Sequence, residues 1–118
     1  RSPRDAFFLQ PLAAVGQLDL VRADFTRPET IEAAIEGAWG VVNLVGAFSG
    51  NLDAVHGQTP GRAASLAAAT GAESFVHVST IGVDRDSPPF YARSKAAGEP
   101  AVRAAFPGAV IVRPSVVF

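Results

Sequence analysis

The chain has 118 residues, of which 48% are hydrophobic and 18% are charged, and its formal net charge is -1. This length and composition are typical of one small globular domain with an apolar core, and they exclude a disordered segment. The near-neutral charge excludes the basic surface of a nucleic-acid-binding protein, and no apolar run approaches the ~20 residues of a membrane span. Cys is absent and only two His residues are present, so we expect no disulfide and no metal site. Met is absent too, which predicts that the chain is a piece of a longer protein.

Four short apolar runs, residues 18–23, 40–46, 75–79 and 109–112, predict β-strands. They are rich in Val, Leu and Ile and run nearly unbroken, as in VVNLV, FVHV and AVIV. Continuous runs of this kind are typical of strands that are covered on both faces, and such strands normally belong to parallel sheets.

Helical patterns lie between these runs. The first has the capping-box spacing from Thr26 to Glu29, and the second begins near Thr59 with a proline at its first position. The third covers residues 90–106, and Pro100 inside it predicts a kink or a helix broken into two. Strand and helix therefore alternate, which predicts an α/β fold with right-handed crossovers.

No glycine-rich turn of the G-x-G-x-x-G type is present, although a Rossmann-like domain normally opens with a strand and such a turn. Residues 1–17 show no clear periodicity and are expected to form a loop and one short helix. Either the chain has a different α/β fold, or the segment with that turn precedes Arg1. The missing Met favours the second explanation.

The only Tyr and the only Lys of the chain, Tyr91 and Lys95, are four residues apart. On a helix this spacing puts both side chains on one face, within reach of each other. An ammonium beside a phenol stabilises the phenolate, so that Tyr91 can exchange a proton near neutral pH. The alternative is a solvated lysine whose aliphatic stem packs against an amphipathic tyrosine.

The surrounding residues favour the chemical interpretation. The predicted strand FVHV ends in Ser79 and Thr80, and the last predicted strand ends at Arg113 and Pro114. Hydroxyl groups at the carboxyl end of a parallel strand lie where open α/β sheets bind their ligands.

At this point the chain resembles a known family, on AD at 23–24, VVNLVG at 41–46, FVHVSTIGVD at 75–84, YARSKAAGE at 91–99 and AVIVRPSVVF at 109–118. It is similar to the short-chain dehydrogenase/reductase superfamily in its extended or atypical branch. Within that branch it most resembles the nucleotide-binding accessory subunits of respiratory complex I and their bacterial relatives, which include NAD(P)-dependent epimerases and dehydratases. The resemblance covers essentially the whole chain.

The resemblance implies a role for each matching residue. Asp24 corresponds to the acid that hydrogen-bonds the adenine, and Arg1 to an arginine that meets the 2′-phosphate, which favours NADP(H) slightly over NAD(H). Tyr91 corresponds to the proton-transfer residue, Lys95 to the group that holds the nicotinamide ribose, and Thr80 to the group that polarises the substrate carbonyl. The residues expected to contact the cofactor are Arg1, Asp24, Asn43, Leu44, Val45, Gly46, Val78, Ser79, Tyr91, Lys95 and Pro114.

The resemblance also implies a fragment of a Rossmann-like doubly wound parallel sheet, over the single partial domain 1–118. It would hold strands three to six with their helices, without the glycine-rich first unit and the carboxy-terminal substrate region. In that family's sheet the first two strands lie between the third and the fourth, so we do not expect this chain to fold as an independent, active unit. His56 stands where many relatives have Asn, and we expect His56 and His77 to be hydrogen-bonded structural histidines.

Three functions stay open at this stage. The first is hydride transfer between NAD(P)(H) and a small carbonyl or alcohol substrate, in a cytoplasmic protein. The second is a non-catalytic accessory subunit that holds NADP(H) among the subunits of respiratory complex I, peripheral on the cytoplasmic face of the inner membrane. The third is a redox sensor that binds cofactor and a protein partner. The many Ala and Arg residues beside a single Lys indicate a GC-rich bacterial genome.

Overall fold

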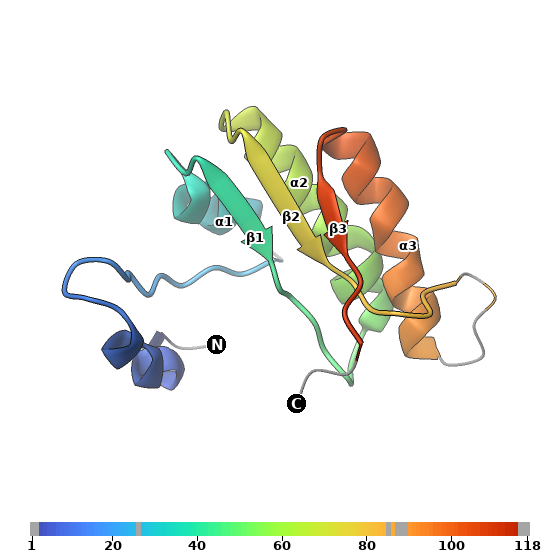
Figure 1. The fold of residues 1–118 in the computed structure, drawn as a ribbon, viewed down its shortest axis with the longest axis horizontal. Coiled ribbons are helices and arrows are strands. Elements are labelled where there is room, and N and C mark those ends of the chain that lie inside the picture. Colours follow the sequence, from blue (N-terminus) through green and yellow to red (C-terminus); the bar gives the residue numbers. More distant parts are fainter. Residues whose placement is uncertain (1–2, 26, 85, 87–89, 116–118) are drawn as a thin grey trace. The chain divides into compact units, whose positions relative to one another are not determined.

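A computed structural model describes residues 3–25, 27–84, 86 and 90–115 of the chain (Figure 1). The chain divides into two compact units, Arg1–Ala34 and Ile35–Phe118, and each is described by itself. None of the helices in the described ranges combines the length and the apolar character of a membrane span.

The first unit contains two short helices and no strand among its described residues. The 3-10 helix η1 (Pro3–Leu12) confirms the short helix expected near the start, and α1 (Pro28–Ile35) follows. The strand predicted over residues 18–23 is not formed, so that prediction is wrong. A strand needs a neighbour to satisfy its backbone groups, and the described part of this unit offers none.

The turn before α1 is held by a hydroxyl group. Thr26, half of the predicted capping box, lies outside the described residues. The Thr30 Oγ accepts the backbone N–H of Asp24 at 2.8 Å and donates to the Arg27 carbonyl at 2.7 Å. After α1, Gly37 has a φ of +71°, a conformation suited to glycine just beyond a helix end.

The second unit is a three-stranded parallel sheet in the order β1 (Gly40–Asn43), β2 (Ser74–Val78), β3 (Val110–Val112). Helices α2 (Thr59–Ala69) and α3 (Phe90–Ala105) lie side by side on one face of this sheet (Figure 1). This arrangement confirms the α/β class and the three later strands that the apolar runs predict. Strand β1 is three residues shorter than its run and β3 one residue shorter, whereas β2 has the predicted length and begins one residue earlier.

The core lies between the sheet and the two helices. Phe75 is fully buried and packs its ring against Phe106, with centroids 5.9 Å apart, while Ala64, Ala67 and Val102 close the space from the helix side. On the opposite face, apolar side chains of all three strands are wholly or partly exposed, with Val42, Val110 and Val112 the most open. The expected cover on both faces is therefore absent from the described residues.

Two helical details differ from the simple pattern. A π-helical segment, η2 (Asp53–Gln58), runs directly into α2, whose start at Thr59 was predicted. Helix α3 is continuous through Pro100, so the prediction of a helix broken into two is wrong. Proline removes a single backbone hydrogen bond, and the buried face of α3, which includes Lys95, Glu99 and Val102, stays packed on both sides of it.

Candidate functional site

A pocket of about 460 Å³ opens where the strands β1, β2 and β3 end. In parallel sheets this carboxyl edge is where ligands bind. The pocket is lined by Leu44, Gly46, Phe48, Val78, Ser79, Thr80, Tyr91, Lys95, Pro114 and Ser115. Segments far apart in the sequence thus meet here, as the predicted topology requires.

Backbone pairing continues past the strand ends into the pocket wall. The Ser79 N–H donates to the Val112 carbonyl at 2.8 Å, and the Ile81 N–H donates to the Pro114 carbonyl at 2.9 Å. Thr80 and Pro114 therefore sit on backbone that is tied across the sheet, which fixes both pocket positions.

Three of the described residues that were predicted from the sequence do not line this pocket. Asn43 is buried and turns its side chain away, and Val45 contributes only its backbone carbonyl. Asp24 belongs to the first unit, which has its own shallow cavity of about 320 Å³ lined by Val21, Arg22, Glu29, Thr30, Ala33 and Ala34. Arg1 lies outside the described residues. In contrast, Phe48 and Ser115 line the pocket without having been singled out, because a lone Phe or Ser in a loop carries no motif.

Lys95 is 4% exposed although it carries an ammonium group. Its Nζ donates to the carbonyls of Val78 at 3.3 Å and Val45 at 3.5 Å, so it bridges the ends of β2 and β1. Burial lowers the pKa of Lys95, because removing an ammonium from water disfavours its charged form. Two long contacts to neutral oxygens leave donor capacity directed at the pocket.

Tyr91 lies one turn before Lys95 on α3, and the Lys95 Nζ is 6.0 Å from the centre of its ring. Phe48 stacks on this ring, with centroids 5.2 Å apart and planes 15° from parallel, and His56 meets it edge-on at 5.1 Å. The predicted pairing of Tyr91 and Lys95 on one helix face is thus present, and two further rings contact the tyrosine.

A second histidine, His77, lies fully buried below the pocket. The Asn43 Oδ1 accepts the Val45 N–H at 3.0 Å, so its amide nitrogen faces the His77 Nδ1 at 3.2 Å and donates to it. Burial and the Lys95 ammonium lower the pKa of His77 to about 4, against an opposing effect of Glu99. Among the described residues, the His77 Nε2 and the Ser79 Oγ are buried without a hydrogen-bond partner.

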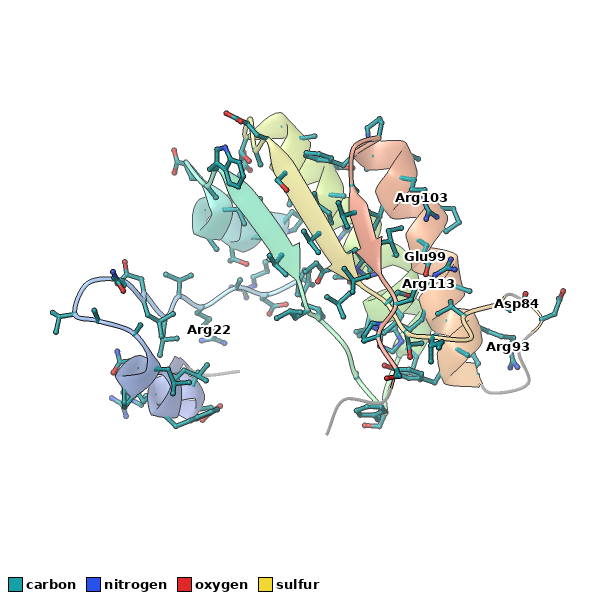
Figure 2. All side chains as sticks on the ribbon, viewed as in Figure 1. Arg22, Asp84, Arg93, Glu99, Arg103 and Arg113 are labelled. Carbon is teal, nitrogen blue, oxygen red and sulfur yellow. The ribbon has the colours of Figure 1, made fainter. Side chains whose placement is uncertain are left out.

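Glu99, which is also buried, forms an ion pair on the side of Lys95 away from Tyr91 along α3. Glu99, one turn after Lys95, receives hydrogen bonds from the Arg113 Nε at 2.9 Å and Nη2 at 2.5 Å, and Arg103 approaches at 3.7 Å (Figure 2). Burial alone would raise the pKa of Glu99, but the Arg113 hydrogen bonds and the two arginine charges lower it overall. Because Arg113 precedes Pro114, this pair ties the pocket wall after β3 to the helix that carries Lys95.

The pocket fits a nicotinamide nucleotide. Gly46 lies beside the ammonium, since a Cβ there would be in van der Waals contact with the Lys95 Nζ at 3.6 Å and with the His56 Nε2 at 3.9 Å. Its missing side chain leaves the ammonium accessible to a ligand with hydroxyl groups, such as a ribose. Leu44, Val78 and Pro114 supply apolar walls for a flat ring.

The comparison with known proteins agrees with this geometry. A family model described as NAD(P)H-binding matches residues 4–117. The chain is 36% identical to NADH dehydrogenase (ubiquinone) 1 alpha subcomplex subunit 9, mitochondrial, of Dictyostelium discoideum, over 93% of this chain and 32% of that protein. It is 32% identical to the Mus musculus protein of the same name, over 97% of this chain and 31% of that protein. It is 33% identical to a ceramide reductase of Caulobacter vibrioides, over 86% of this chain and 33% of that protein.

The chain spans about a third of the length of these curated relatives. The family match, in contrast, covers nearly the whole chain and includes every described residue of the pocket. The chain therefore belongs to the NAD(P)H-binding family, with relatives of the extended short-chain dehydrogenase/reductase type.

Proposed function

We propose that this pocket holds the nicotinamide end of NAD(P)H and supports reduction of a small carbonyl group, or oxidation of the alcohol. One observation carries the proposal: a buried ammonium, Lys95, faces a pocket that also contains Tyr91 and Thr80. The bound nicotinamide would supply or accept the hydride. NADP(H) is favoured over NAD(H), on the sequence position of Arg1 alone.

In this proposal each side chain has a separate task. Lys95 donates hydrogen bonds to the ribose hydroxyls, and its Nζ lies 6.0 Å from the centre of the Tyr91 ring. Tyr91 gives a proton to the carbonyl oxygen, or takes it from the alcohol. Thr80 donates a hydrogen bond to the same oxygen as negative charge develops on it, with Ser79 beside it.

A second function rests on the relatives, because several of them are named as mitochondrial subunits of NADH dehydrogenase. In this alternative the protein holds NADP(H) without turnover as an accessory subunit on a respiratory complex. Lys95 and Tyr91 would then act only as ligands of the ribose.

The test is to purify the full-length protein natively, denature it, and identify any released nucleotide by mass spectrometry. NADPH and NADH are then titrated into the nucleotide-free protein by calorimetry. Release of NADP(H) or clear binding supports the proposal, and binding without NADPH oxidation by any of a panel of aldehydes and ketones supports the accessory-subunit function. Absence of both nucleotide and binding would refute both.

A further inference from the structure

His56 lies at the junction of three parts of the second unit and is 1% exposed. It belongs to the π-helical segment η2, and its ring reaches both the loop after β1 and the first two turns of α3. Both ring nitrogens are engaged. Nε2 lies 3.0 Å from the Ala47 backbone nitrogen, and Nδ1 lies 2.8 Å from the Ser94 Oγ.

These partners determine where the ring proton lies. A backbone N–H can only donate, so the His56 Nε2 accepts from Ala47 and the proton belongs on Nδ1. Nδ1 then donates to the Ser94 Oγ, and the Ser94 hydroxyl donates onward to the Tyr91 carbonyl at 2.8 Å. The result is a directed chain of hydrogen bonds from the pocket loop through the imidazole to the backbone of the tyrosine.

The same ring contacts the tyrosine side chain directly. The two ring centroids are 5.1 Å apart and the planes meet at 81°, an edge-to-face contact. The backbone of η2 is also pressed against α3, because a Cβ at Gly98 would overlap the His56 carbonyl oxygen. His56 is thus held from both its backbone and its ring.

We propose that His56 is a positioning residue with two separable effects: its bond to Ser94 orients Tyr91 for proton transfer, and its bond to Ala47 holds the loop from Leu44 to Ala47 that forms the cofactor side of the pocket. This inference rests on the proposed function. Neither effect needs His56 to touch the substrate.

Two amide side chains separate the effects. His56→Asn places an amide near the Nδ1 position and keeps a donor for Ser94, whereas His56→Gln places an amide oxygen near the Nε2 position and keeps an acceptor for Ala47. In the full-length protein we expect His56→Gln to lower kcat about 10- to 100-fold, with the KM for NADPH changed less than about threefold. We expect His56→Asn to raise the KM for NADPH about tenfold while kcat stays within about threefold of the wild type.

Val102→Ala is the matched control. Val102 is fully buried on α3 but does not line the pocket, so its truncation lowers Tm without separating kcat from KM. If His56→Asn and His56→Gln change kcat and KM together, in proportion to their loss of Tm, His56 is only a core residue and the proposal is wrong.

Two readouts need no cofactor, and they separate this inference from the proposed function. Nitrogen-15 NMR of the wild type must show the Nδ1–H tautomer of His56, and a Nε2–H tautomer overturns the inference. Hydrogen exchange of the Ala47 amide should accelerate in His56→Asn but not in His56→Gln, and equal exchange in both overturns it as well. A wild-type protein that binds no NADPH refutes the proposed function. The tautomer and the Ala47 exchange rate would still show whether His56 makes its two hydrogen bonds.

Discussion

Both units of the chain contain apolar runs, but the runs differ in whether they form a strand and in how far their side chains are buried. In the first unit, Val21 lies in an apolar run that forms no strand and is 62% exposed. In the second unit, Phe75 lies in a run that became β2 and is fully buried, with strands on both sides of it. An apolar run therefore becomes a strand only where neighbours satisfy its backbone and a helix layer covers its side chains.

The units also differ in where their polar groups lie. The second unit buries Lys95, His56, His77 and Glu99 in one region next to the pocket. In the first unit, the Thr30 hydroxyl makes a turn contact with Asp24. In the proposed function the chemistry therefore belongs to residues of the second unit, whereas cofactor binding by Asp24 of the first unit stays a prediction.

The largest expected effect tests that division. Tyr91→Phe removes the proton donor, so we expect kcat to fall about 10²- to 10⁴-fold while the Kd for NADPH changes little. Asp24→Asn should do the reverse, raising the Kd about tenfold through one weakened hydrogen bond to the cofactor. Stopped-flow kinetics and calorimetry on the full-length protein measure both quantities. A loss of kcat in Asp24→Asn as large as in Tyr91→Phe would contradict the division.

The second prediction concerns stability. Phe75→Ala leaves a cavity in the core and should lower the free energy of unfolding by about 3–5 kcal/mol. Val21→Ala, at an exposed position, should change it by less than about 0.5 kcal/mol. Urea unfolding gives both values, and a cost above 2 kcal/mol for Val21→Ala would mean that residues 18–23 are packed in the full-length protein.

The smallest effect concerns pH. The pKa of His77 is lowered to about 4 in the folded protein, so between pH 6.5 and 4 the unfolded chain binds a proton that the folded chain does not. The contribution of His77 to the free energy of unfolding should therefore reach its maximum above pH 6.5. It should fall by about 3 kcal/mol by pH 4. His77→Gln should flatten this slope in urea titrations at pH 7.5, 5.5 and 4.5. The part that remains belongs to His56, whose pKa is also lowered by burial and by Lys95, and at the lowest pH to Glu99, whose pKa is lowered by Arg113. An unchanged slope in His77→Gln would show that His77 is not buried in the neutral form.

Much of the second unit could be predicted from the sequence because its signals are local. Continuous Val and Ile runs predict the parallel strands, and the four-residue spacing of Tyr91 and Lys95 predicts their shared helix face. The same reasoning failed for residues 18–23, because a strand depends on a partner that the run itself does not reveal. It also failed for Pro100, where packing of the buried face of α3 outweighs one missing hydrogen bond.

In the candidate site, the sequence predicted those residues that belong to a recognisable motif. Val78, Thr80, Tyr91, Lys95 and Pro114 follow strand ends or a helix spacing, and the structure brings them together. Phe48 could not be found this way, since its stacking on Tyr91 depends on the path of a loop. The pair of Glu99 and Arg113 was missed as well, because opposite charges 14 positions apart give no sign that they meet.

Helix α3 packs very closely against η2 and α2, and this limits how the helices can shift against one another. A Cβ at Gly61 would lie 2.7 Å from the Ala101 Cβ, and a Cβ at Gly98 would overlap the His56 carbonyl, so backbone rests almost directly on its neighbour. At these two glycines no side chain of their own separates the helices, so no change of rotamer there can absorb a displacement. We therefore expect α3 to have little room to approach η2 and α2, because backbone atoms already stand in contact at Gly61 and Gly98.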